Sequence, residues 1–141
     1  MKALAVSGKD RVKHTSKPRR QAMVARHVRL ELHAAGTGHL DAKRIAAYLQ
    51  IPLSSLAAGT ARSVAAIHKA PAANSLQDAL SPVARTISLL SEILQSKEHV
   101  RAWLHSPHPD LGNQIPMRLI QEGHAGVVAD MLQAALAGQP S

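Results

Sequence analysis

The amino-acid sequence predicts an all-α fold, with helix-turn-helix-like helices in the N-terminal part and a small helical bundle after them. Alanine and leucine, which both favour helices, contribute 25 and 17 of the 141 residues. Apolar residues recur at intervals of three and four in several stretches, which is the period of a half-buried helix. No run alternates between apolar and polar residues for long enough to predict a strand.

Length and composition limit the classes of protein to which the chain can belong. A chain of 141 residues suits one domain, or two very small ones that share a core. The absence of cysteine excludes disulfides and thiolate metal sites. No apolar run approaches the ~18 residues of a membrane span, so we expect a cytoplasmic protein that does not bind a membrane. The Arg-rich, acid-poor beginning leaves an organellar transit peptide as a less favoured alternative.

The positive charge is concentrated at the beginning of the chain. Residues 1–30 contain nine Lys or Arg residues and a single acidic residue, Asp10, which gives a net charge of +8. Residues 31–141 contain eight basic and eight acidic residues, so this part is neutral. A solvated basic arm is the plainer interpretation. The sharper one is an arm that contacts phosphates, because Lys and Arg that neutralise phosphates release counterions.

Residues 1–38 are expected to form a basic arm followed by an amphipathic helix. Pro18 suits the first position of a helix, and the two glycines at 36 and 38 are expected to end it. The apolar stripe of this helix consists of Val24, Val28, Leu32 and Ala35. The basic residues that we predict to contact DNA here are Arg19, Arg20 and Arg26.

Residues 39–72 contain the pattern of three short helices. Asp41 is expected to cap the first, the second follows Pro52, and the third extends from Arg62 to Lys69 with Val64 and Ile67 inside. Short helices joined by tight turns are compatible with a helix-turn-helix, whose last helix enters the major groove. The predicted DNA contacts in this segment are Arg62, Ser63 and Lys69. A plain helical-bundle segment is the alternative, and Gln50 occupies the turn where such motifs often have glycine.

Residues 73–97 contain a longer helical pattern. Pro82 lies near its start, where it either kinks one helix or opens a second. The apolar stripe is wide because Leu89 and Leu90 are neighbours. The stripe serves either the core of one chain or, as we favour, the seam of a homodimer that would place two DNA-binding segments on a palindromic site.

Residues 98–141 form the part of the chain with the most distinctive sequence. Two short apolar turns flank a loop in which Pro107, Pro109 and Pro116 restrict the backbone, so the loop is expected to be rigid. We expect Trp103, the single tryptophan, to lie in the core among aliphatic side chains. A last helix is predicted from about His124 to Ala137.

The motifs of this last part resemble the signature of the C-terminal toxin-binding domain of the Xre/MbcA/ParS antitoxin family. They are Ala102-Trp103-Leu104, Ser106-Pro107-His108, Asp110-Leu111-Gly112, Pro116-Met117, Leu119-Ile120 and Gly123. The resemblance extends from about Leu76 to Gly138. One departure is His108, because the family usually has Asn after the first proline of the loop. The residues expected to maintain the motif structurally are Trp103, Leu104, Pro107, Leu111, Gly112, Pro116 and Gly123.

The resemblance implies the antitoxin of a type II toxin–antitoxin system. It implies as partner a RES-domain toxin that consumes NAD and whose active site the antitoxin occludes, and it also implies a homodimer. A helix-turn-helix at residues 39–72 would bind operator DNA and repress the operon. Polarity and position select the candidate toxin contacts Asp110, Asn113, Gln114, Arg118, Gln139, Pro140 and Ser141.

Two other functions remain as alternatives. The first is a helix-turn-helix transcriptional regulator without a toxin. The second, less favoured, is a small metal- or ligand-binding helical protein that uses His105, His108 and Asp110, although the intervening prolines make a shared coordination sphere awkward. The sequence contains neither a Gly-rich phosphate loop nor a zinc-protease motif, so we expect no catalytic activity and no cofactor.

Overall fold

A computed structural model describes Met23, Val28 and residues 30–138. Residues Leu30 to Leu32 are helical and precede the other elements. The elements that follow are α2 (Ala42–Leu49), α3 (Leu53–Ala57), α4 (Val64–Lys69), the 3-10 turn η1 (Asn74–Leu76), α5 (Gln77–Leu94), α6 (Lys97–Leu104), the 3-10 turn η2 (Pro109–Leu111), α7 (Pro116–Gln121) and α8 (Ala125–Leu136).

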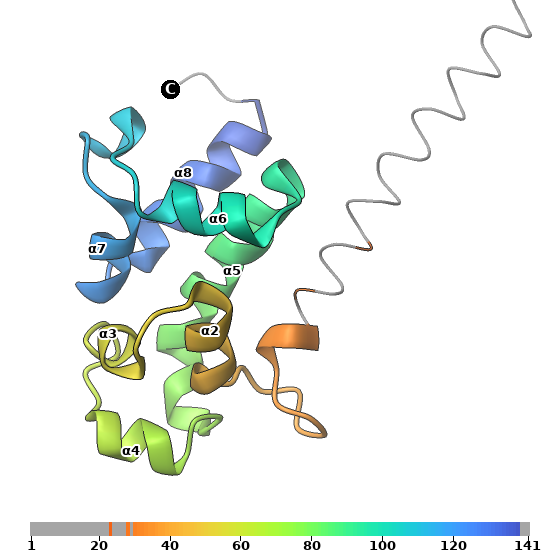
Figure 1. Cartoon of the computed structure of the whole chain (residues 1–141), viewed down its shortest axis with the longest axis vertical. Helices are drawn as coiled ribbons and strands as arrows, with labels where there is room; N and C mark the ends of the chain where they lie inside the picture. Colours follow the sequence, from red (N-terminus) through yellow and green to blue (C-terminus); the bar gives the residue numbers. More distant parts are fainter. Residues whose placement is uncertain (1–22, 24–27, 29, 139–141) are drawn as a thin grey trace, which may run out of the picture.

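Helix α5 runs through the middle of the molecule. Helices α2, α3 and α4 lie around its N-terminal half, and α6, α7 and α8 lie around its C-terminal half (Figure 1). Its most extensive contacts are with α8. Leu80 and Ile87 of α5 and Val128 of α8 are completely buried in the core between these helices. A single core therefore connects the two halves of the chain.

The all-α prediction is confirmed. Within the described residues, β-structure is limited to isolated bridges, between His33 and Leu40 and between His108 and Gln114, and no strand is formed. No helix in this part of the chain is long and apolar enough to cross a membrane. The proposed division into segments 1–38, 39–72, 73–97 and 98–141 stays a prediction.

The helix expected to end at Gly36 ends earlier. Val28 and Leu32 are buried, as the apolar stripe predicted, but Ala35 is exposed. The chain reverses after Leu32, because Gly36 and Gly38 have φ values of +86° and +73° and the Asp41 N–H donates to the Leu32 carbonyl at 3.0 Å. Ala35 therefore lies in a turn, outside the helix on whose apolar face it was expected.

The three short helices predicted between residues 40 and 70 are present, but the third differs from the prediction in its first residue and in the exposure of Val64. Asp41 caps α2 by accepting a hydrogen bond from the Arg44 N–H at 3.1 Å. Helix α4 begins at Val64, two residues later than predicted, because Ser63 caps it by accepting from the Ala66 N–H at 3.1 Å. Val64, which we expected inside, is 42% exposed.

The turn between α2 and α3 explains how Gln50 replaces the expected glycine. Gln50 has φ +56° and ψ +45°, which is the left-handed conformation that glycine adopts most readily. Its N–H caps the end of α2 by donating to the carbonyls of Ala46 and Ala47. Gln50 therefore forms this glycine-like turn at a conformational cost of about 1 kcal/mol.

Helix α5 is continuous through Pro82, so the alternative of two helices is wrong. The hydroxyl of Thr86 donates to the Pro82 carbonyl at 2.8 Å on the following turn. Most of the predicted apolar stripe, including Leu80, Val83, Ile87 and Leu90, packs inside the chain. Ile93 is the large apolar residue of α5 that stays exposed, at 48%. The described chain therefore uses the stripe mainly for its own core.

The corner around Trp103 differs from the prediction. Leu104, the next residue, is completely buried, whereas Trp103 is only partly buried and packs against the edge of the core. The loop that follows is exposed over most of its length, with Leu111 as its buried anchor. Polar and aromatic groups are therefore accessible at this corner.

Candidate partner-binding site

His108 organises the loop between α6 and α7. Its N–H donates to the Gln114 carbonyl at 3.1 Å, and its carbonyl accepts from the N–H groups of Leu111 and Asn113 at 3.0 and 2.9 Å. Its ring nitrogen Nδ1 lies 3.3 Å from the Asp110 N–H and accepts from it. The loop is thus closed by four hydrogen bonds to a single residue.

The side chain of His108 makes two contacts within this corner. Its Nδ1 bond to an N–H two residues later is of the kind that an Asn oxygen makes in an Asx-turn. Because Nδ1 is the acceptor, the tautomer with its ring proton on Nε2 is assigned. The ring additionally packs on Trp103, with centroids 4.9 Å apart and planes inclined by 50°. His108 therefore supports the turn and adds an aromatic contact.

The backbone around η2 turns sharply on two adjacent residues. Gly112 and Asn113 both have left-handed conformations, with φ of +64° and +62°, a region that Gly and Asn tolerate better than other residues. Asp110, before the turn, and Asn113, after it, consequently face different hollows. The loop presents two distinct surfaces on a rigid frame.

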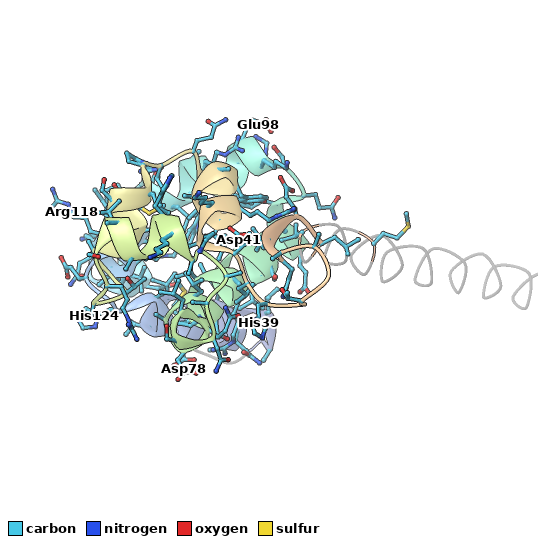
Figure 2. The ribbon with its side chains drawn as sticks, turned by 90° about the horizontal axis from the view of Figure 1, so that it is seen from below. His39, Asp41, Asp78, Glu98, Arg118 and His124 are labelled. Carbon is cyan, nitrogen blue, oxygen red and sulfur yellow. The ribbon has the colours of Figure 1, made fainter. Side chains whose placement is uncertain are left out.

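The first surface, which we call the loop hollow, is polar. It has a volume of about 480 Å³ and is lined by Pro107, Asn113, Gln114, Ile115, Arg118 and Glu122. Three of the predicted contacts, Asn113, Gln114 and Arg118, meet here, and all three are exposed. Arg118 points outward from α7 (Figure 2). These three residues therefore line one hollow, while their contact with a toxin stays a prediction.

The second surface, which we call the Trp103 groove, is mainly apolar. It has a volume of about 170 Å³ and is lined by Leu90, Ile93, Leu94, Trp103, His108, Asp110, Met131, Leu132 and Ala135. Asp110, which was predicted to act with Asn113, belongs to this surface. Sequence reasoning missed Ile93 and Met131 as site residues, because helical periodicity assigned both to a buried face.

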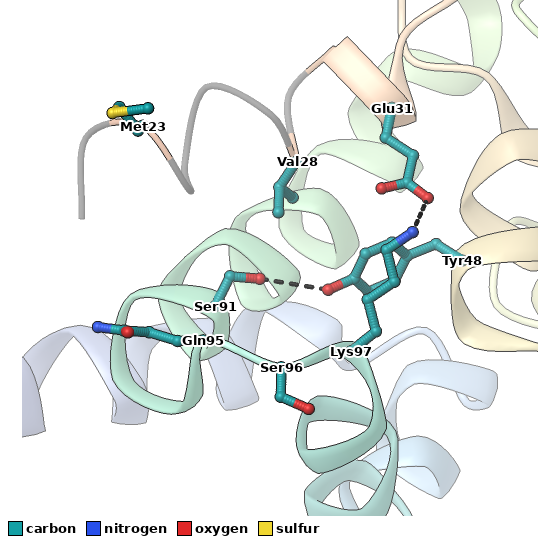
Figure 3. Close-up of a pocket in the computed structure, with 8 residues that line it drawn as sticks. All are labelled: Met23, Val28, Glu31, Tyr48, Ser91, Gln95, Ser96 and Lys97. Atoms are coloured by element: carbon teal, nitrogen blue, oxygen red, sulfur yellow. Dashed lines mark hydrogen bonds and ion pairs between the residues drawn. The ribbon is translucent and has the colours of Figure 1, made fainter. Parts of the chain in front are cut away.

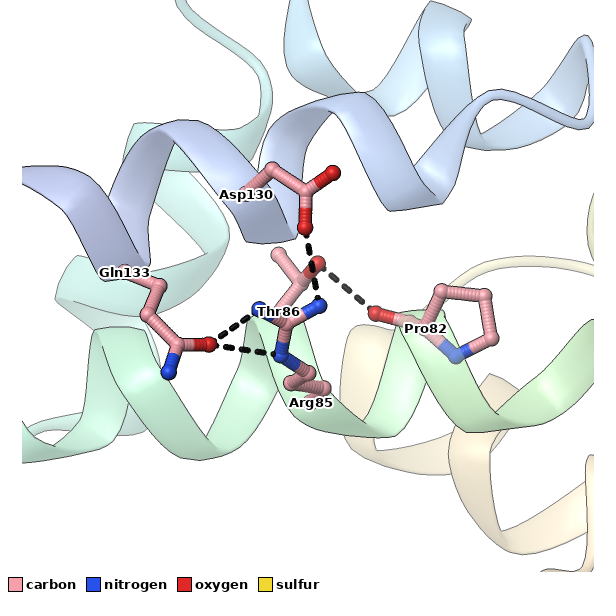
Figure 4. Close-up of polar contacts among 5 residues, drawn as sticks. All are labelled: Pro82, Arg85, Thr86, Asp130 and Gln133. Carbon is pink, nitrogen blue, oxygen red and sulfur yellow. Dashed lines mark hydrogen bonds and ion pairs between the residues drawn. The ribbon is translucent and has the colours of Figure 1, made fainter.

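Arg85 holds together the two helices that form the walls of the Trp103 groove. Its guanidinium donates to Asp130 at 3.1 Å and, through Nε, to Gln133 at 3.0 Å (Figure 4). These side chains are exposed, so the ion pair contributes ~1 kcal/mol or less. Arg85 thus links the exposed side of α5 to the side of α8 that bears Asp130 and Gln133.

A third hollow lies where the N-terminal segment meets the body. It encloses about 430 Å³ and includes Glu31, Tyr48 and Lys97 in its lining. Glu31 and Lys97 form an ion pair, and the Tyr48 hydroxyl lies 3.3 Å from the Ser91 hydroxyl (Figure 3). Lys97 Nζ lies 5.5 Å from the centroid of the Tyr48 ring. The ion pair fastens the N-terminal segment to α6, and the two contacts of Tyr48 hold α2 against α5 and α6.

The predicted DNA-binding residues are distributed over two regions. Arg62 and Lys69 are exposed at the two ends of α4, of which only Ile67 is buried. The hydroxyl of Ser63 is used as the cap of α4, so it is less available for a base or phosphate than predicted. The other predicted contacts lie outside the described residues, namely Arg19, Arg20 and Arg26 for DNA and Gln139, Pro140 and Ser141 for the toxin.

The histidine loop does not assemble a metal centre in the described part of the chain. No group of three or more His, Cys, Asp or Glu side chains there could hold a metal ion. The Nδ1 atom of His108 already accepts a backbone hydrogen bond and lies 4.0 Å from an Asp110 carboxylate oxygen. The metal-binding alternative gains no support from this geometry.

The loop hollow and the Trp103 groove both lie within a region that matches a known protein family. Residues 89–138 match the family described as the antitoxin Xre/MbcA/ParS C-terminal toxin-binding domain. Comparisons with curated proteins and with solved structures found no significant match. The matched residues include the complete loop, α6, α7 and α8.

Proposed function

We propose, from the premise that residues 89–138 form an Xre/MbcA/ParS C-terminal toxin-binding domain, that this protein is the antitoxin of a RES-domain toxin. The toxin consumes NAD in the systems that the resemblance implies, and the antitoxin neutralises it by covering its active site. The observation that carries the proposal is the coincidence of the matched residues with an exposed, rigid polar loop. A rigid loop binds with a smaller loss of conformational entropy than a loop that must first be ordered.

The loop hollow supplies the polar contacts of this proposed interface. Arg118 offers a planar guanidinium that suits a carboxylate of the toxin, while Asn113 and Gln114 offer both donors and acceptors. Glu122 on the same wall would pair with a basic residue. Residues 139–141 follow two residues after the end of α8 at Leu136 and are proposed to reach the toxin as well.

The N-terminal part is proposed to bind operator DNA and to repress the operon. Two features support this: the charge of +8 within residues 1–30 and the exposure of α4 with a basic residue near each end. In this proposal α4 enters the major groove, Arg62 and Lys69 contact phosphates, and the arm adds nonspecific affinity. The homodimer remains part of the proposal, because paired half-sites require two α4 helices.

Co-expression with a RES-domain toxin encoded next to this chain tests the toxin-binding function. The wild-type chain is expected to restore growth and to co-purify with the toxin. Arg118→Ala should weaken the complex by roughly tenfold, as expected when one charged contact of an interface is removed. Arg44→Ala, at an exposed position of α2 outside the matched region, is the matched control and should leave toxin affinity unchanged. Failure of the wild-type chain to bind or to rescue would refute the proposal.

A reciprocal experiment tests the DNA-binding function. The double variant Arg62→Ala and Lys69→Ala should lose operator affinity in gel-shift assays, and its salt dependence should become shallower. Arg118→Ala serves here as the control with normal DNA binding. A stand-alone regulator, the second candidate, would retain operator binding without any toxin partner. A chain that binds the toxin but no DNA would restrict the proposal to its C-terminal half.

A further inference from the structure

The Trp103 groove is an apolar surface that the described residues leave open. Ile93 at its rim is 48% exposed, and Leu136, directly after the lining residue Ala135, is 44% exposed. Trp103 and Met131 are partly buried and complete the lining. Monomeric proteins seldom leave large apolar side chains together in a hollow unless a partner contacts them.

Resting on the proposed function, we propose that the Trp103 groove receives one apolar side chain of the toxin, and that a neighbouring basic residue of the toxin pairs with Asp110. Every lining residue lies between 90 and 135, inside the matched toxin-binding domain. The groove is thus continuous with the domain that is described as contacting the toxin. It shares its loop with the loop hollow, so one toxin surface can cover both.

The size of the groove limits what enters it. Its volume of about 170 Å³ is slightly larger than an apolar cavity of ~150 Å³ that holds a benzene molecule. One aromatic or branched aliphatic side chain therefore fits, and a helix or strand does not. Contacts of this kind, in which a single side chain fills a pocket beside an aromatic residue, dominate the affinity of many interfaces.

The acidic residue at the rim of the groove indicates which type of toxin residue would lie beside the apolar side chain. Asp110 is the acidic residue among the lining residues, and its side chain is 54% exposed. The Asp110 backbone N–H is held by His108, so the backbone that carries the carboxylate is fixed at the rim of the groove. A Lys or Arg adjacent to the apolar residue of the toxin would complement this carboxylate.

The affinity of the full chain for the purified toxin tests the inference by isothermal titration calorimetry. Ile93→Gln should weaken binding by at least ~10-fold, because it places an amide at the rim without changing the charge. Val127→Gln is the matched control, since Val127 is 53% exposed on α8 and lies outside the groove. It should change the affinity by less than ~2-fold. Asp110→Asn should weaken binding by about 2–5-fold at low salt and less at high salt.

A second measurement observes the groove directly. Trp103 is the single tryptophan of the chain, so fluorotryptophan labelling gives one fluorine NMR resonance. Toxin binding should shift this resonance, and Ile93→Gln should reduce the shift at equal toxin concentration. Unchanged thermal unfolding of the variant would show that the fold is intact.

The outcomes separate the inference from the proposed function. If the wild-type chain binds the toxin but Ile93→Gln binds as tightly and the resonance does not move, the groove is not the anchor site. If Ile93→Gln converts a dimer into a monomer and leaves toxin affinity unchanged, the groove joins two copies of the chain and the inference is wrong. If the wild-type chain does not bind the toxin, the proposed function itself fails.

Discussion

Replacing Gly59 with alanine tests the contact that connects the N-terminal helices to the toxin-binding domain. Gly59 follows α3 and lies against the end of α7. A Cβ atom built on Gly59 would lie 2.3 Å from the Ile120 carbonyl oxygen and 3.4 Å from the Gly123 nitrogen. Its own φ is not in the left-handed region, so the constraint is the space available rather than the backbone conformation.

The expected loss of stability follows from the overlap between the added Cβ atom and the Ile120 carbonyl oxygen. Ordinary van der Waals contacts of a Cβ begin at 3.4 Å, so the backbone of α7 must move by about 1 Å. Overpacking in a well-packed region costs about 1–3 kcal/mol, and a backbone neighbour places the cost at about 2–3 kcal/mol. For a chain of this length, 1 kcal/mol changes Tm by roughly 4 °C, so Gly59→Ala should lower Tm by about 8–12 °C.

Thermal and urea unfolding followed by circular dichroism measure this effect. Gly126→Ala is the control, because Gly126 lies inside α8 with no atom within 4 Å of the added Cβ. Removing a glycine from a helix should make that variant more stable by about 0.5–1 kcal/mol. If Gly59→Ala unfolds at or above the wild-type temperature, the close approach of α3 and α7 is not as the structure describes it.

Three further predictions concern the turn residues and the basic arm. His108→Ala should weaken toxin affinity by about 5–30-fold because the loop loses a hydrogen bond and an aromatic contact, whereas His108→Asn should weaken it less because Asn can keep the hydrogen bond and loses only the aromatic contact; equal effects in calorimetry would contradict the role of Nδ1. Gln50→Gly should raise the unfolding free energy by up to ~1 kcal/mol in urea titrations, and a loss of stability would show that the Gln50 side chain matters more than its backbone. Removal of residues 1–30 should weaken operator binding by ~10-fold or more and flatten its salt dependence, and an unchanged slope in a gel-shift salt series would exclude the arm from the DNA complex.

Helical periodicity was sufficient to predict the longer elements. The repeats that end in Leu94 and Leu136 predicted α5 and α8 to within a few residues, because each of these helices buries most of one face. Periodicity does not, however, state which element covers the apolar face. We favoured a dimer seam for the stripe on α5, but the pattern alone does not exclude an intrachain core, and the most extensive contacts of α5 are with α8.

Short elements were predicted less well for a physical reason. In a helix of six residues such as α4, Val64 and Ile67 lie on nearly the same side, and one tertiary contact decides which is buried. Periodicity also could not predict that Asp110 and Asn113 line different hollows. That separation arises from consecutive left-handed residues at 112 and 113, one of which is not glycine.

Hydrogen–deuterium exchange of the full chain, with and without the purified RES-domain toxin, tests the central claim most directly. We expect toxin binding to slow exchange in residues 105–122 and in the last turns of α8, and to leave α2 to α4 unchanged. Protection confined to residues 42–69, or none within residues 105–122 of a formed complex, would contradict the assignment of toxin binding to this loop.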